Sequence, residues 1–151
     1  MANRYEAPVT IAAEQLDIEF SRADIEFHDV DHSGASYEGR VFLNNPRADA
    51  TTPLTPENGY AGAFHIFGHG GCFGDDEGHC TVLPRRRYDP RPAHQLTLAR
   101  KVVIATEAVR LALAAGPQVT VKVVPIVRAT TPKAGPDDVF SYDHVSIVTY
   151  P

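Results

Sequence analysis

The stretch QVTVKVVPIVR, from Gln118 to Arg128, decides the fold class. Valine and isoleucine dominate it, and their branched side chains suit the surface of a pleated strand. Pro125 lies inside this run, and because proline has no N–H to donate, we expect an edge strand or a bulge there. The segment just before it, TEAVRLALAAG (Thr106 to Gly116), has helical spacing instead. The sequence therefore predicts a short helix that is followed directly by a strand.

The expected helix has signals for both of its ends. Thr106 can cap the N-terminus, and Gly116 followed by a proline ends the helix. Val109, Ala112 and Leu113 fall on one side, which predicts one buried face. No other segment of the chain has this pattern.

Further strand candidates share either period-two alternation or a high content of β-branched and aromatic residues. They are the alternating sets Leu16, Ile18 and Phe20, Ile25 and Phe27, and Val41 and Leu43, and the runs Ala61 to Gly68, Arg100 to Thr106 and Val139 to Tyr150. One short helix among about seven strands predicts a single antiparallel, jelly-roll-like β-sandwich domain over residues 1–151. The long irregular segments Asn44 to Tyr60 and Gly68 to about Leu96 are where we expect a site or an interface.

The length and the net charge of the chain indicate which stabilising links it needs and which binding partners they favour. A chain of 151 residues buries a core without help from disulfides. Its 14 basic and 19 acidic residues give a net charge of −5, which favours neither nucleic acid nor an anionic membrane surface. The N-terminus shows no secretory signal and no apolar run is long enough to span a bilayer, so we expect a cytoplasmic protein.

The segment HIFGHGGCFGDDEGHC holds three of the seven histidines and both cysteines. Imidazole and thiolate are donors that suit copper or zinc, and a mononuclear site needs three or four of them close together. The glycines around Gly68 permit the turn that this convergence requires. We therefore expect a copper or zinc site, and its candidate ligands are His65, His69, Cys72, His79 and Cys80.

Two other interpretations of this segment stay open. A disulfide between Cys72 and Cys80 would close a short loop and contribute about 2.5 kcal/mol in the chain-entropy model. A glycine-rich loop with unpaired thiols is the other. The spacing permits a metal site without requiring one, since neither Cys-x-x-Cys nor His-Glu-x-x-His occurs in the chain.

The segment FHDVDHSG places His28 and His32 four residues apart. They could serve as additional ligands or as groups just outside the metal's ligands. We favour the alternative, in which they hydrogen-bond within a turn closed by Ser33 and Gly34. His144 is expected to point outward from a strand.

Three short motifs resemble the C-terminal domain that follows the di-copper catalytic domain in tyrosinases and polyphenol oxidases. They are Phe42, Leu43 and Asn44, then Ala61, Gly62 and Phe64, then the run Val119 to Pro125. The resemblance covers roughly Ile18 to Tyr150 and implies a β-sandwich that packs over a type-3 copper site, shielding it or assisting copper loading. It also implies a role for Cys72 and Cys80, because some members of the family use cysteines for copper uptake. The six catalytic histidines are absent.

These observations lead to one hypothesis and an alternative from another class. The first is a copper-binding accessory module that serves a tyrosinase-like catalytic protein. The alternative is a small mononuclear copper or zinc enzyme acting on a small substrate such as a phenol, with His65, His69 and His79 as first ligands. A structural domain with incidental cysteines is the simplest interpretation, and nothing in the sequence indicates an oligomeric state.

Overall fold

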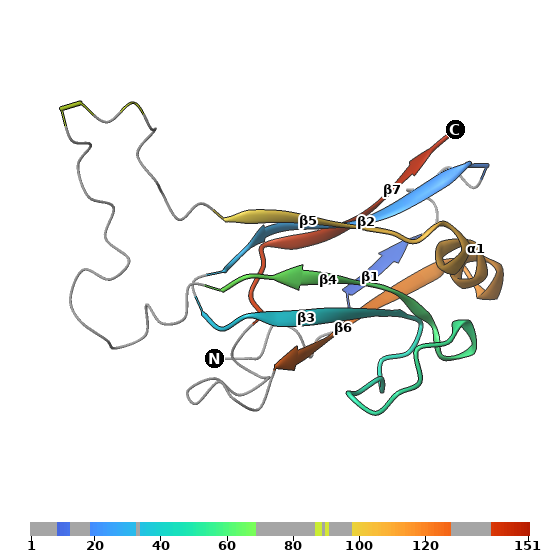
Figure 1. Ribbon diagram of the computed structural model, residues 1–151. Helices are drawn as coiled ribbons and strands as arrows, with labels where there is room; N and C mark the ends of the chain where they lie inside the picture. Colours follow the sequence, from blue (N-terminus) through green and yellow to red (C-terminus); the bar gives the residue numbers. More distant parts are fainter. Residues whose placement is uncertain are drawn as a thin grey trace.

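The computed structural model describes residues 9–12, 19–32, 34–68, 87–88, 90, 98–127 and 140–151. Two antiparallel sheets pack face to face in this part of the chain, and one helix lies at one end of them (Figure 1). The prediction of an antiparallel β-sandwich with a single short helix is confirmed for these residues. No helix among them is long and apolar enough to cross a membrane.

Each sheet joins segments that are far apart in the sequence. The four-stranded sheet has the order β1 (Val9–Ala12), β6 (Gln118–Val127), β3 (Tyr37–Leu43) and β4 (Tyr60–Ile66). The three-stranded sheet has the order β5 (Ala99–Ile104), β2 (Arg22–Val30) and β7 (His144–Tyr150). All neighbouring strands are antiparallel. The last strand begins at His144, later than the predicted start at Val139.

The core lies between the two sheets and is rich in aromatic rings. Phe27, on β2, is fully buried, and its ring centroid lies 5.0 Å from that of Phe64 on β4. The rings of Phe140 and Tyr142 meet the Phe27 ring edge-on at 5.8 and 5.9 Å. Edge-on contacts of this kind stabilise aromatic pairs beyond the area they bury. The segment before β7 therefore closes the core although it is not itself a strand.

Helix α1 (Thr106–Ala115) packs its predicted face against the sandwich, with Val109 and Ala112 buried. The expectation that Thr106 caps the helix is wrong, since Thr106 is its first helical residue and no side-chain cap is present. Its Oγ1 instead accepts a hydrogen bond from the backbone N–H of Ala23 at 3.1 Å. The threonine thus ties the start of the helix to β2.

Among the described residues, β6 is paired on one side only at Pro125. β1 pairs with residues 118–121 of β6, whereas β3 pairs with residues 121–127. The N–H and C=O of Thr120 both bond toward β3, and backbone groups alternate sides along a strand. The nitrogen of Pro125 therefore points away from β3, toward a side where no described strand pairs, as expected for a local edge.

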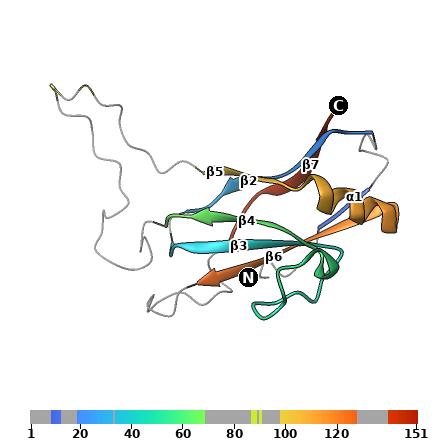
Figure 2. The same ribbon diagram turned by 45° about the vertical axis from the view of Figure 1, so that its right-hand side comes forward.

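The two sheets come close together where β4 faces β5 (Figure 2). Gly62 on β4 has a φ of 137°, and a Cβ atom at this position would lie 2.7 Å from Cγ1 of Val103 on β5. Only glycine fits this approach without displacing its neighbour.

Candidate functional site

Two buried carboxylates lie on the outer face of the three-stranded sheet. Asp24 and Glu26 alternate along β2 with side chains that enter the core. Those core side chains are Ala23, Ile25 and Phe27. The carboxylates therefore point away from the core, yet the two residues are only 2% and 5% exposed. Ionised groups this well covered require partners.

Arg22 is the partner of Asp24. Its Nε and Nη2 donate to the two carboxylate oxygens at 2.8 and 2.7 Å, which is a bidentate pair. The hydrogen bond to Asp24 raises the pKa of Arg22 above its ordinary value. The guanidinium also lies over the ring of Tyr150, with its Cζ 5.5 Å from the ring centroid. Arg22 therefore links β2 to the end of β7.

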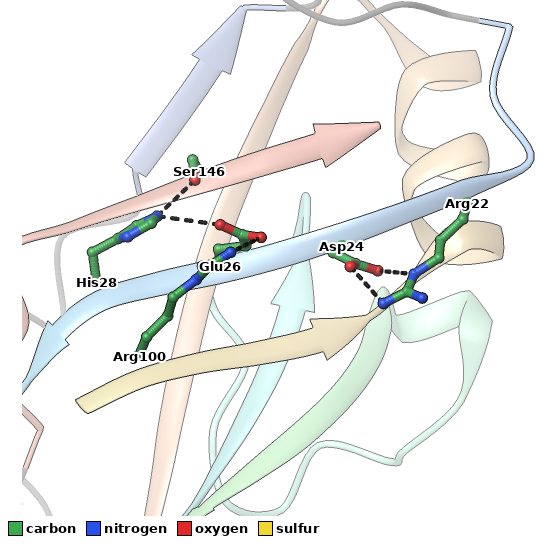
Figure 3. A network of polar contacts seen from close by, with 6 residues as sticks. All are labelled: Arg22, Asp24, Glu26, His28, Arg100 and Ser146. Carbon is green, nitrogen blue, oxygen red and sulfur yellow. Dashed lines mark hydrogen bonds and ion pairs between the residues drawn. The ribbon is translucent and has the colours of Figure 1, made fainter. Parts of the chain in front are cut away.

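Glu26 is the centre of a second group of polar contacts (Figure 3). Arg100 on β5 donates from Nη2 to one carboxylate oxygen, and Nε2 of His28 lies 3.6 Å from the other. The same His28 nitrogen lies 3.0 Å from Oγ of Ser146 on β7. All three strands of the sheet thus contribute to one ionic network.

The network is not arranged for nucleophilic catalysis. A Ser-His-acid triad needs the serine and the carboxylate on different nitrogens of the imidazole, so that one nitrogen takes the proton while the other is held. Ser146 and Glu26 both approach Nε2 of His28. The geometry therefore supports a structural role for these contacts.

A β-bulge lies beside this network. His28 and Asp29 together occupy the space opposite the single residue Arg100, between the regular pairs of β2 with β5. Asp29 has a φ of 55°, in the left-handed region. On its other side His28 keeps its register with His144 of β7. The bulge therefore deforms only the β5 side of β2.

A groove of about 770 Å³ lies between α1 and the loop that joins β3 to β4. Ile104 and Leu111 line it and are 64% and 56% exposed, so it offers apolar contact. Glu57, in the short 3-10 helix η2 (Pro56–Asn58), and Glu107 add carboxylates to its lining. The predicted irregular segment from Asn44 thus forms one wall of a cavity.

Asn44 holds this wall in place. Its side-chain amide donates to the carbonyl of Ala112 in α1 at 3.3 Å, and its Oδ1 accepts from the N–H of Thr120 in β6 at 2.9 Å. Its φ of 54° is left-handed, which asparagine tolerates better than most residues. One side chain therefore connects the loop, the helix and the neighbouring strand.

The predicted metal ligands fall largely outside the part of the chain that is described. His69, Cys72, His79 and Cys80 lie outside the described residues, so neither a metal site nor a disulfide is tested for them. His65 is described, and it lies exposed on β4 opposite Glu38 of β3. Its imidazole points to solvent from the outer face of the four-stranded sheet.

The structure does not bring His28 and His65 together. His28 points outward from the three-stranded sheet and His65 from the four-stranded sheet, so the core separates them. His28 belongs to β2 and contacts Ser146 across the sheet, whereas Ser33, which would close the expected turn with Gly34, lies outside the described residues. His32 follows the end of that strand. Among the described residues there is no group of three or more His, Cys, Asp or Glu side chains that could hold a metal ion.

Sequence reasoning missed the ionic network. The signal was present, because Asp24, Glu26 and His28 are polar at every second position, between the apolar residues that predicted the strand. Arg100 and Ser146 could not be added, since they come from strands whose pairing with β2 is not visible in the sequence. The outward orientation predicted for His144 is confirmed.

The fold and the site together define an antiparallel β-sandwich domain with an ionic outer sheet face. Solved structures of latent aurone synthase, a polyphenol oxidase, have a similar fold. The recombinantly expressed enzyme matches with a TM-score of 0.52 at 14% identity, covering 96% of this chain and 24% of that chain. Its co-crystal with hexatungstotellurate(VI) matches with a TM-score of 0.54 at 15% identity, covering 98% and 25%. The enzyme from its natural source gives a TM-score of 0.52 at 15% identity, covering 98% and 24%.

The chain thus spans about a quarter of the length of the polyphenol oxidase chains it matches. This coverage is consistent with a C-terminal-like domain, so the resemblance inferred from the sequence is confirmed at the level of the fold. No family model and no curated protein matches the sequence.

Proposed function

We propose that this chain is an accessory module that binds copper through the segment from His65 to Cys80 and serves a tyrosinase-like catalytic protein, either by shielding its copper site or by loading it. The fold match carries the proposal, because nearly all of this chain corresponds to a quarter of a polyphenol oxidase chain. The di-copper catalytic domain that the resemblance implies would belong to the partner.

The position of His65 supports this assignment. β4 ends at the end of the sandwich opposite α1 (Figure 1), and the other four proposed ligands follow it in the sequence. Next to that end, the N–H of Gly68 donates to Oγ of Ser36 at 3.0 Å, which fixes the chain just before His69. An exposed imidazole at a fixed point, followed by imidazole and thiolate donors, suits an exchangeable copper or zinc site.

Copper binding is tested on protein purified without added metal. Elemental analysis, thiol counting and titration with copper and with zinc should give near-stoichiometric metal for the unmodified chain. Binding should be lost in Cys72→Ser/Cys80→Ser and weakened in His65→Ala. His144→Ala is the matched control, since this exposed histidine lies on the other sheet. Oxidation of both thiols to a Cys72–Cys80 bridge, without metal, would contradict the proposal.

The accessory role is tested by copper transfer. The copper-loaded chain is mixed with the metal-free catalytic domain of a polyphenol oxidase, and oxidation of a phenol reports the metal received. We expect activity to appear with the unmodified chain and to be absent with Cys72→Ser/Cys80→Ser. Equal transfer by the two proteins would contradict a donor role. Chelator-sensitive turnover by the chain alone would instead support the small metalloenzyme.

A further inference from the structure

Among the described strands, β5 lies at the edge of its sheet and has one side without a partner. β2 pairs with one side of β5, and no described strand pairs with the other. Just beyond the strand, the N–H of Ala105 bonds to the carbonyl of Ala23 at the start of β2. Because backbone groups alternate sides, the N–H and C=O of Arg100, Val102 and Ile104 point to the free side.

Lys101, on the inner side of this strand, is a charge of the kind that protects edges, but the outer side near its end is apolar. Val102 and Ile104 are 42% and 64% exposed, and both point to the outer face of the sheet. Arg100 is the charged residue on that face, and its guanidinium bonds to Glu26 over its own sheet (Figure 3). Apolar side chains therefore lie beside backbone groups with which no described strand pairs.

We propose that a second copy of this chain pairs with β5 as an antiparallel strand, about a two-fold axis at Val102. Val102 then lies opposite Val102 of the second copy, and Ile104 lies opposite its Arg100. Both are hydrogen-bonded positions, where residues exchange two N–H···O=C bonds. The result is one continuous sheet with the order β7, β2, β5, β5, β2, β7.

The register places no like charges directly opposite one another. Arg100 meets Ile104 of the second copy, so its aliphatic stem packs on an apolar side chain. Lys101, on the inner side of the strand, meets Val103, so no like charges lie directly opposite one another. Each copy carries a net charge of −5, and screening by salt should therefore favour association. An edge-to-edge contact is small, which predicts a dimer that dissociates in the micromolar range.

Sedimentation velocity of the full chain across micromolar concentrations tests the association. We expect a monomer–dimer equilibrium for the unmodified chain and a monomer for Val102→Pro. Proline removes only a donor that points to the free side, so the pairing of β5 with β2 keeps its hydrogen bonds. Val102→Thr keeps this donor and should still dimerise. A monomeric unmodified chain, or an unchanged equilibrium in Val102→Pro, would overturn the proposal.

A cysteine pair tests the register without depending on proline. In a Cys72→Ser/Cys80→Ser background, Val102→Cys places two thiols at a hydrogen-bonded pair, with Cα atoms about 5.5 Å apart, within disulfide range. Ile104→Cys is the matched control, since its two copies would lie about 13 Å apart along the strands. We expect an oxidised dimer from Val102→Cys alone. Equal cross-linking of the two variants, or of neither, would exclude this pairing.

Discussion

The imidazole rings of His28 and His144 lie stacked, with their centroids 4.2 Å apart and their planes 8° from parallel. The two residues are direct partners in the register of β2 and β7. Each ring is also held from its edge, because Nε2 of His28 lies 3.0 Å from Oγ of Ser146 and Nδ1 of His144 lies 2.7 Å from a carboxylate oxygen of Asp143. The stack therefore fastens the start of β7 to the middle strand of its sheet.

Removing one ring should weaken this connection. We expect His144→Ala to lower the free energy of unfolding by about 0.5–1 kcal/mol, measured by urea denaturation, because a cross-strand ring contact is lost. A double-mutant cycle with His28→Ala should show a coupling of about 0.5 kcal/mol or more. His65→Ala, on the other sheet, should change stability by less than about 0.5 kcal/mol. Additive single effects would show that the stack contributes nothing.

The buried carboxylate of Asp24 should contribute more to the free energy of unfolding than an exposed carboxylate does. Asp24→Asn breaks a bidentate pair with Arg22 at a residue that is 2% exposed, and we expect a loss of about 1.5–3 kcal/mol in unfolding free energy. Glu107→Gln is the matched control, because its ion pair with Arg110 lies at the surface of α1, where such pairs contribute about 0–1 kcal/mol. Equal losses in the two variants would contradict this difference.

The hydroxyl of Tyr37 is buried and has no hydrogen-bond partner among the described residues. An unsatisfied polar group is costly, so Tyr37→Phe should leave stability unchanged or raise it by up to about 1 kcal/mol. Thermal and urea unfolding at neutral pH measure the change. A loss of more than about 1 kcal/mol would mean that the hydroxyl has a partner after all.

The same tyrosine should make the fold sensitive to alkali. Burial, and secondarily the charge of Asp31, raise the pKa of Tyr37 above its ordinary value of 10.0, so the folded state favours the neutral phenol. The contribution of the neutral Tyr37 phenol to the free energy of unfolding is complete below pH 10. It is lost as the pH rises above 10, because the unfolded chain ionises first. Burial also raises the pKa of Tyr142, which adds to the slope. Tyr37→Phe should therefore lose stability less steeply above pH 10; identical slopes would contradict this assignment.

Gly59 is required by the backbone of the groove wall. Its φ is 81°, and a Cβ atom would lie 2.1 Å from the carbonyl oxygen of Leu43. Gly59→Ala should lower the free energy of unfolding by about 1–3 kcal/mol. Gly116, which ends α1, is the matched control, because it is extended and a Cβ there meets nothing within 4 Å. Gly116→Ala should stay within about 0.5 kcal/mol in the same urea experiment.

Strands β2 and β3 were predictable from the sequence because burial on one face imposes a period of two, whereas β1 was not predicted and Phe20, expected in a strand, lies in none. Ile25 and Phe27 marked β2, and Val41 and Leu43 marked β3. Their partners were not predictable, since pairing depends on contacts between segments that are distant in the chain. The role of Thr106 was missed for the same reason, because its hydroxyl bonds to Ala23 of another element instead of capping its own helix.

The candidate site was predicted less well than the fold. The high density of histidine and cysteine predicted a site in the segment from His65 to Cys80. Only residues 65–68 of this segment belong to the described part of the chain. The ionic face was overlooked because Asp24 and Glu26 look like ordinary solvent-facing residues of an alternating strand. Their burial results from Arg22 and Arg100, and the position of Arg100 over Glu26 exists only once β5 lies beside β2.

The order of the strands also has a consequence for the kinetics of folding. Among the described strands, β3 and β4 are the only partners that follow one another in the sequence. The partners of β2 are β5 and β7, and the second partner of β3 is β6, so these pairs join segments that are far apart in the chain. Chains dominated by such distant pairings fold in milliseconds to seconds, because the entropy of closing long loops is lost before the contacts form. The hairpin of β3 and β4, closed at Gly59, is thus the one described strand pair that can form between neighbours in the sequence, and a substitution there should slow refolding as well as lower stability.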